Sequence, residues 1–138
     1  METTLKCHRI IGGYGEGEAL ISHEPICFYL TDPKTGTVRE KNHELAGKNI
    51  ANKVLVFPSG KASSVVQIDG LYKLAAHNVA PKAMIVKDVE TVLIVSAFLV
   101  KIPLVDKLEQ DPFEAIHTGD FVKVDAEKGK VRISKAPA

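Results

Sequence analysis

The sequence predicts an α/β fold with a parallel core and an extra β layer. Between residues 53 and 105, short apolar runs typical of buried strands alternate with segments whose apolar residues recur at helical spacing. The residues on either side read as further strands separated by turns. Strand–helix–strand units imply right-handed crossovers between parallel strands. We therefore expect the middle of the chain to form the parallel core and its two ends to form the extra layer.

The first fifty residues are expected to be short strands and turns. Residues 3–11 alternate partly between apolar and polar, and residues 18–22 form a candidate strand. The glycine-dense stretch from Gly13 to Gly17 is interpreted as a bulge or tight bend. Residues 32–36 read Asp-Pro-Lys-Thr-Gly, which is a strong turn signal, and residues 42–49 are polar and loop-like.

The remaining strands are predicted from apolar runs. Three of them, at residues 53–57, 83–86 and 104–105, belong to the alternating core. Strands at residues 121–124 and 131–134, joined by a turn near residues 127–129, are expected to close the chain as a hairpin.

Two helices are predicted between the core strands. The first begins at Ser63 or Ser64, which are natural N-cap residues, and ends near Asn78, before Pro81. The second covers residues 90–99. It is expected to be a helix because five residues fall on one face, namely Val92, Leu93, Ser96, Leu99 and Val100.

Length and charge indicate one domain that does not bind nucleic acid. A chain of 138 residues is long enough for a single core, and no linker or repeat divides residues 1–138. The 18 basic and 17 acidic residues give a net charge of +1, which argues against a nucleic-acid surface.

Neither a membrane span nor a signal peptide is predicted, so we expect a cytoplasmic protein. The longest mostly apolar stretch, residues 91–105, is too short for a span and is interrupted by Lys101 and Pro103. Two cysteines, Cys7 and Cys27, are expected to be reduced in such a compartment.

The loop after the 53–57 strand is the candidate binding site. It reads Pro-Ser-Gly-Lys from residue 58 to Lys61, and Ser63 and Ser64 then open the predicted helix. A helix N-terminus offers unpaired N–H groups and a favourable dipole to an anion, and Lys61 adds a positive charge. Simple helix capping is the alternative role for the two serines.

Other motifs are excluded by their spacing. A P-loop would need glycine at Leu55 and serine or threonine at Ala62. The glycines of residues 13–17 do not match the dinucleotide fingerprint. The five histidines show no metal-ligand spacing, so no metal site is expected on this chain. Two cysteines are too few to hold a cubane iron–sulfur cluster.

Five motifs in order resemble the small subunit of the aconitase X family. They are Gly17-Glu-Ala-Leu20, Asp32-Pro-Lys-Thr-Gly36, Val54-Leu-Val-Phe-Pro-Ser-Gly-Lys61, Ala80-Pro-Lys-Ala83 and Ile102-Pro-Leu-Val105. The likeness covers about residues 12–125. It implies the swivelling three-layer β/β/α domain of aconitase-like hydro-lyases. It also implies a large partner subunit that carries an iron–sulfur cluster, with the active site between the two chains.

The resemblance also implies a reaction and its residues. In archaeal members, 5-phosphomevalonate loses water to give trans-anhydromevalonate 5-phosphate in a modified mevalonate pathway. The family loop usually reads Pro-Ser-Gly-Arg/Lys-Gly-Ser-Ser/Thr, and its general base falls on Ser63 here. Ser59, Gly60, Lys61 and Ser64 match the flanking positions that hold the anionic hydroxy-acid substrate.

The chain departs from the family pattern at several glycines. Ala62 stands in place of glycine, Val66 and Gln67 replace a Gly-Ser pair, and Ser96 replaces a further glycine. Residues 27–32 lack a double glycine. Because such glycines permit close backbone approach, their loss predicts a reshaped pocket. A non-catalytic binding or assembly module is the alternative that the missing glycines suggest. A dehydratase of another hydroxy acid, such as a hydroxyproline, is a second alternative. The small subunit of isopropylmalate isomerase fits the expected fold but not this set of motifs.

Overall fold

The computed structural model describes residues 2–61 and 63–137. Two longer helices are present, α1 (Ser64–Ala76) and α2 (Thr91–Val100), and two short ones, η1 (Phe28–Leu30) and α3 (Pro112–Ala115). The strands are β1 (Glu2–Lys6), β2 (His8–Ile11), β3 (Tyr14–Ile21), β4 (Val54–Phe57), β5 (Ala83–Val86), β6 (Leu104–Asp106), β7 (Phe121–Asp125) and β8 (Lys130–Ser134).

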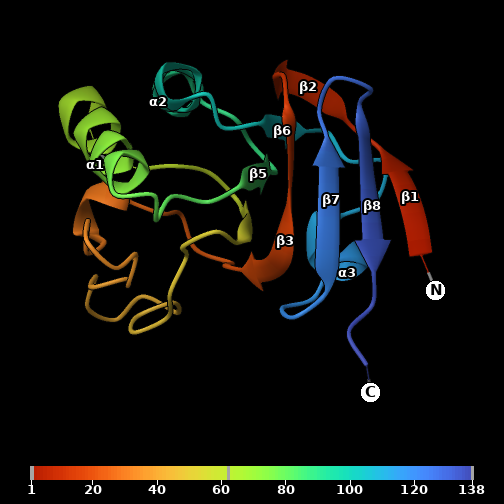
Figure 1. Ribbon diagram of the computed structural model, residues 1–138, viewed down its shortest axis with the longest axis horizontal. Coiled ribbons are helices and arrows are strands. Elements are labelled where there is room, and N and C mark those ends of the chain that lie inside the picture. The colour runs from red at the N-terminus through yellow and green to blue at the C-terminus, as the bar shows by residue number, and fades with distance from the viewer. Residues whose placement is uncertain (1, 62, 138) are drawn as a thin grey trace.

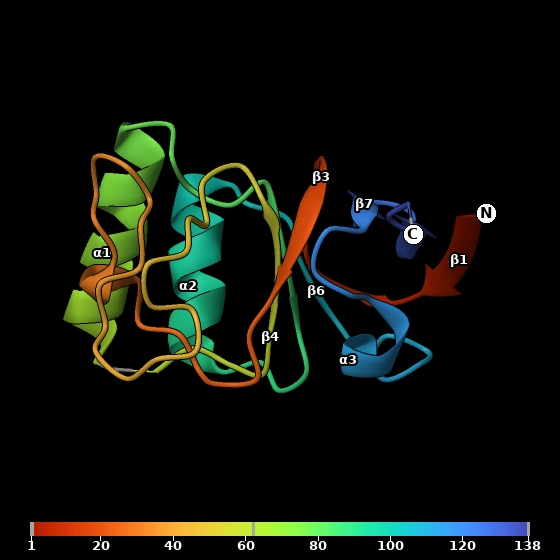
Figure 2. The same ribbon diagram turned by 90° about the horizontal axis from the view of Figure 1, so that it is seen from below.

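These elements form three layers. Helices α1 and α2 lie together on one side of the β4–β6 strands, and the β7, β8 and β1 strands lie on the other (Figures 1 and 2). Strand β3 joins the two sheets, because its first half pairs antiparallel with β7 and its last residues pair parallel with β4. The β4–β5 and β5–β6 pairs are also parallel. The predicted α/β fold with a parallel core and an extra β layer is confirmed.

The strand order explains how the two ends of the chain complete the sheets. It runs β1-β8-β7-β3-β4-β5-β6-β2, so the consecutive strands β1 and β2 occupy opposite ends. Strand β1 pairs antiparallel with β8, and β2 pairs antiparallel with β6. The N-terminal segment therefore crosses from the outer sheet to the edge of the parallel sheet.

The parallel strands are apolar throughout because both of their faces are covered. In β4, Leu55 and Phe57 belong to the core beneath the helices. Val54 and Val56 alternate with them and pack in the core between the two sheets. All four side chains are fully buried. Continuous apolar runs are typical of such two-sided strands, which is why β4 and β5 are readable from the sequence.

Two local predictions are wrong. The segment expected to bend at Gly13–Gly17 is regular strand from Tyr14 onward, and within it only Gly13 has a left-handed conformation, with φ of 122°. A Cβ on Gly15 would lie 2.1 Å from the carbonyl oxygen of Lys82, so glycine is needed here for close approach.

The second wrong prediction concerns the buried face of α2. Leu99, which was expected on that face, is 57% exposed, and Ala97 lies in the buried face instead. Helix α3 was not predicted.

Gly70 lets α1 pack directly on the backbone of η1. A Cβ at this position would lie 2.3 Å from the nitrogen of Tyr29 and 2.6 Å from the carbonyl carbon of Phe28. We therefore expect Gly70→Ala to lower the free energy of unfolding by about 1–3 kcal/mol, although alanine favours an isolated helix. Urea denaturation measures this change. The control Tyr72→Ala, on the exposed side of α1, should stay within about 0.5 kcal/mol, and equal stability of the two variants would contradict the close approach.

Candidate active site

The predicted binding loop lies at the edge where the parallel strands end. It follows β4 directly, and it is held by the segment that follows β3. The N–H of Ile26 donates to the carbonyl of Ser59 at 3.1 Å, and the N–H of Lys61 donates to the carbonyl of Ile26 at 3.2 Å. Ile26 and Gly60 thus form a short parallel bridge. The carboxyl edge of a parallel sheet is where ligands bind in open α/β folds.

Gly60 lies where the starts of both helices converge. A Cβ on Gly60 would come within 2.7 Å of Gln67 Nε2, from the first turns of α1, and 2.9 Å of Glu90 Oε1. Glu90 is the N-cap residue of α2, and its carboxylate accepts from the N–H groups of Val92 and Leu93 at 2.8 and 2.9 Å. A side chain at this position would have to displace the hydrogen-bonded ends of Gln67 and Glu90.

Ser63 and Ser64 lie at the start of α1, as predicted. Ser63 occupies the N-cap position with an extended backbone (φ −70°, ψ 162°), and Ser64 is the first helical residue. Both are exposed. The capping alternative fails for the Ser63 side chain in one respect: its hydroxyl makes no cap hydrogen bond to the first turn. The hydroxyl group is thus placed at the positive end of the helix dipole without serving the helix itself.

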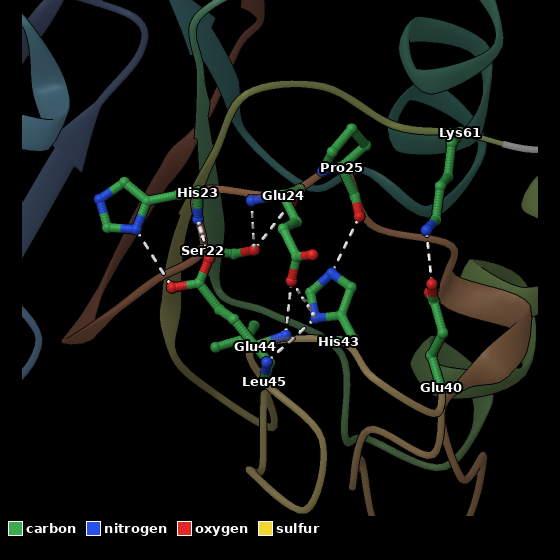
Figure 3. Close-up of polar contacts among 9 residues, drawn as sticks. All are labelled: Ser22, His23, Glu24, Pro25, Glu40, His43, Glu44, Leu45 and Lys61. Atoms are coloured by element: carbon green, nitrogen blue, oxygen red, sulfur yellow. Dashed lines mark hydrogen bonds and ion pairs between the residues drawn. The ribbon is translucent and has the colours of Figure 1, made fainter.

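Lys61 is paired with an acid that the sequence did not indicate. Its Nζ forms an ion pair with the carboxylate of Glu40, from the loop between η1 and β4 (Figure 3). The Lys61 side chain is 40% exposed and that of Glu40 is 19% exposed. An anion that binds Lys61 therefore has to compete with a carboxylate already in place.

The segment before Ile26 is fixed by a polar network around His43 (Figure 3). His43 Nε2 lies 2.9 Å from the carbonyl oxygen of Pro25, and Nδ1 accepts from the N–H of Leu45 at 3.0 Å. Because a carbonyl can only accept, Nε2 carries the proton and the ring is neutral in this arrangement. The side chain of His43 is 2% exposed. His43 therefore has a buried structural role, in which it holds the backbone of Pro25 and Leu45 together.

Glu44 strengthens the same network. Burial alone would raise the pKa of its carboxyl group, but hydrogen bonds from the side chain and backbone N–H of His23 outweigh this and lower the pKa. The backbone N–H of Glu44 donates in turn to the Glu24 carboxylate. The segment of His23 and Glu24 is therefore joined to the segment of Glu44 by charged hydrogen bonds next to the binding loop.

Among the residues that the structure describes, neither cysteine lies in a group of potential metal ligands. Cys7 and Cys27 are both free thiols, one half-buried and one buried. Burial and the nearby Asp106 and Asp125 raise the pKa of Cys7 to about 11, which disfavours the thiolate that a metal requires. Within the ranges described, no three His, Cys, Asp or Glu side chains are grouped to hold a metal ion.

None of the helices in these ranges has the length and apolar composition to span a bilayer.

Comparison with known proteins identifies the family. Residues 4–133 match the family model of the aconitase X swivel domain. The chain belongs to this family. The resemblance seen in the sequence and the swivel-domain fold are both confirmed.

Two curated relatives of this swivel domain carry the same name. The phosphomevalonate dehydratase small subunit of Methanocella arvoryzae is 47% identical over 131 residues, covering 94% of this chain and 98% of the relative. That of Methanosarcina acetivorans is 46% identical over 132 residues, covering 95% and 91%. The crystal structure of Thermococcus kodakaraensis aconitase X in its holo form matches with a TM-score of 0.87 and 40% identity, over 96% of this chain and 99% of that one.

The departures from the family loop fall on both described and undescribed residues. Ala62 lies outside the residues that the structure describes. Gln67, in contrast, is fully buried and its side chain is hydrogen-bonded at both ends. Neither Gln67 nor Glu40 was recognised as a site residue from the sequence, because each reaches its partner across a long separation in the chain.

Proposed function

We propose that this swivel domain is the small subunit of a phosphomevalonate dehydratase, a hydro-lyase that removes water from 5-phosphomevalonate to give trans-anhydromevalonate 5-phosphate. The observation that carries the proposal is the 46–47% identity, over nearly the whole chain, to two archaeal relatives of that name. The loop geometry supports it, since the loop presents a hydroxyl and a cation at a helix N-terminus.

Ser63 is proposed as the general base. In the dehydration, the C–H bond next to the carboxylate breaks and its proton passes to Ser63 Oγ in its alkoxide form, which becomes the hydroxyl. The electron pair of that bond forms the carbon–carbon double bond as the hydroxyl group leaves from the neighbouring carbon. A serine is a poor base at its ordinary pKa, so it needs nearby positive charge. The N-terminus of α1 and the Lys61 ammonium are suited to supply it.

The other loop residues are proposed to hold the substrate anion. Ser59, Gly60, Lys61 and Ser64 offer a hydroxyl, backbone N–H groups and an ammonium close to the start of α1. Hydrogen bonds to a charged group are shorter and about twice as strong as neutral ones, so these contacts would fix the carboxylate of the hydroxy acid against Ser63.

A larger partner subunit completes the site in this proposal. The relatives are named small subunits, which implies a larger one. The iron–sulfur cluster, whose Lewis acidity would assist loss of the hydroxyl group, is proposed to reside on that partner, since the two cysteines of this chain are too few to hold it. Location in the cytoplasm remains part of the proposal.

Reconstitution with the large subunit tests the function. We expect the two chains to co-purify and to convert 5-phosphomevalonate, with product detected by ³¹P and ¹H NMR. Each chain alone should be at least 100-fold less active, because the site needs groups from both. Turnover of a hydroxyproline in place of 5-phosphomevalonate would show a different substrate. A complex inactive on both, or no complex, would favour a binding or assembly module.

A further inference from the structure

We infer that Gln67 is a positioning residue for the two ends of the binding loop, Lys61 and Ser63. It fixes Lys61 through the peptide of Ile26 and Ser63 through its own backbone. The inference rests on the proposed function for its catalytic consequence, but its structural part stands on this chain alone. Gln67 lies one turn into α1 and is fully buried.

The side chain of Gln67 spans two backbone groups of the neighbouring segment. Its Nε2 donates to the carbonyl of Ile26 at 2.9 Å, and its Oε1 accepts from the N–H of Phe28 at 2.8 Å. Both hydrogen bonds are buried. Loss of a buried partner leaves a backbone group without a hydrogen bond, which is more costly than the loss of an exposed one. The amide therefore locks the register of segment 26–28 against α1.

Ile26 connects Gln67 to the first part of the loop, Ser59 to Lys61. Its carbonyl accepts from Gln67 Nε2 and also from the N–H of Lys61, which uses both of its lone pairs. Its N–H donates to the carbonyl of Ser59. A shift of the Ile26 peptide would thus move Ser59 and Lys61 together.

The backbone of Gln67 fixes the other end of the loop, at Ser63. The N–H of Gln67 donates to the carbonyl of Ser63 at 3.0 Å, closing the first turn of α1. Gln67 is therefore tied to Ser63 directly and to Lys61 through one peptide. It therefore fixes the positions of the proposed base, Ser63, and the proposed anion contact, Lys61, relative to each other, although it touches neither side chain.

An amide is suited to this role in a way that other side chains of similar size are not. Methionine at position 67 would fill the space without either hydrogen bond. Glutamate would keep an acceptor for the Phe28 N–H but would place a second oxygen against the Ile26 carbonyl oxygen. The pair Gln67→Met and Gln67→Glu therefore separates the Ile26 contact from the Phe28 contact. Ser96→Ala is a matched control: Ser96 is also a buried polar residue, but it sits on α2 and its hydroxyl bonds only the carbonyl of Val92.

We call the contacts of Gln67 with Ile26, Phe28 and Ser63 the Gln67 clamp. Amide hydrogen exchange of the full-length chain tests this clamp without any assay of activity. Both Gln67 variants should lose protection roughly tenfold at the Lys61 N–H. Only Gln67→Met should lose it at the Phe28 N–H, and Ser96→Ala should change neither. Unchanged protection at Lys61 in both variants would overturn the inference, whatever the function of the protein. Failure of both variants to fold would also overturn it, because the residue would then serve the whole domain.

Kinetics of the reconstituted complex test the consequence for catalysis. We expect kcat to fall about 10- to 100-fold in both Gln67 variants with assembly retained, since small displacements of a base are sufficient for such losses. Wild-type kcat together with lost protection at Lys61 would overturn the positioning role. If the wild-type complex does not act on 5-phosphomevalonate, the proposed function fails, while the exchange experiment still decides whether the clamp exists.

Discussion

Ser63→Ala is expected to reduce kcat of the reconstituted dehydratase by roughly 10²- to 10⁴-fold, the range that general acid–base catalysis contributes. The hydroxyl lies at the N-cap of α1, is exposed and makes no cap hydrogen bond, so its removal takes no capping interaction from the fold. Assembly with the large subunit and the melting temperature of the chain should therefore stay close to those of the wild type. Steady-state kinetics and size-exclusion chromatography measure the two expectations.

A matched serine controls for the loss of a hydroxyl as such. Ser134 lies on β8, in the outer sheet away from α1 and α2, and Ser134→Ala should keep wild-type kcat (Figure 1). If Ser63→Ala and Ser134→Ala turn over substrate equally fast, Ser63 is not the base. If Ser63→Ala fails to assemble, its hydroxyl serves the interface between the subunits and the proposed chemistry has to be moved to another residue.

Substitutions of Lys61 and Glu40 are expected to act in opposite directions on substrate binding. Lys61→Met removes the proposed anion contact and should raise KM about 10- to 100-fold, the value of a hydrogen bond to a charged group. Glu40→Gln removes the carboxylate that now pairs with Lys61 and should lower KM a few-fold, because the substrate no longer competes with it. Both effects should weaken as the salt concentration rises, since the pair is partly exposed.

The double variant shows whether the two residues act through each other. In the Lys61→Met background, Glu40→Gln should have no further benefit, and Lys128→Met, in the β7–β8 turn, should leave KM unchanged. A rise in KM for Glu40→Gln alone would mean that Glu40 orients Lys61 for the substrate rather than competing with it. That result would reverse the role assigned to the ion pair.

The sequence was sufficient for those parts of the fold that depend on local pattern. Strands β4 and β5 are apolar at every position because both faces are covered, and α1 has helical spacing that begins at Ser63. The regular strand through Gly15 was missed for the opposite reason. Its glycine is required by the backbone of Lys82 beneath it, and such an approach between distant segments leaves no local pattern.

The same distinction holds for the site. The loop and the placement of Ser63 at a helix start could be predicted, because they lie on consecutive residues with a recognisable motif. The partners of that loop could not: Glu40 is 21 residues from Lys61, and Ile26 is 41 residues from Gln67. Gln67 stands where the family usually has the serine of a Gly-Ser pair. Its two buried hydrogen bonds show that the glutamine is built into the support of the loop.

Deuterium exchange at the carbon next to the substrate carboxylate is the most direct test of Ser63 as the base in a site completed by the large subunit. When the wild-type complex is incubated in D₂O with 5-phosphomevalonate, the reversible proton transfer should place deuterium at that carbon, visible by ¹H NMR. The Ser63→Ala complex, assembled to the same extent, should show exchange reduced at least 100-fold. Exchange at the wild-type rate in Ser63→Ala, or from the large subunit alone, would contradict the account.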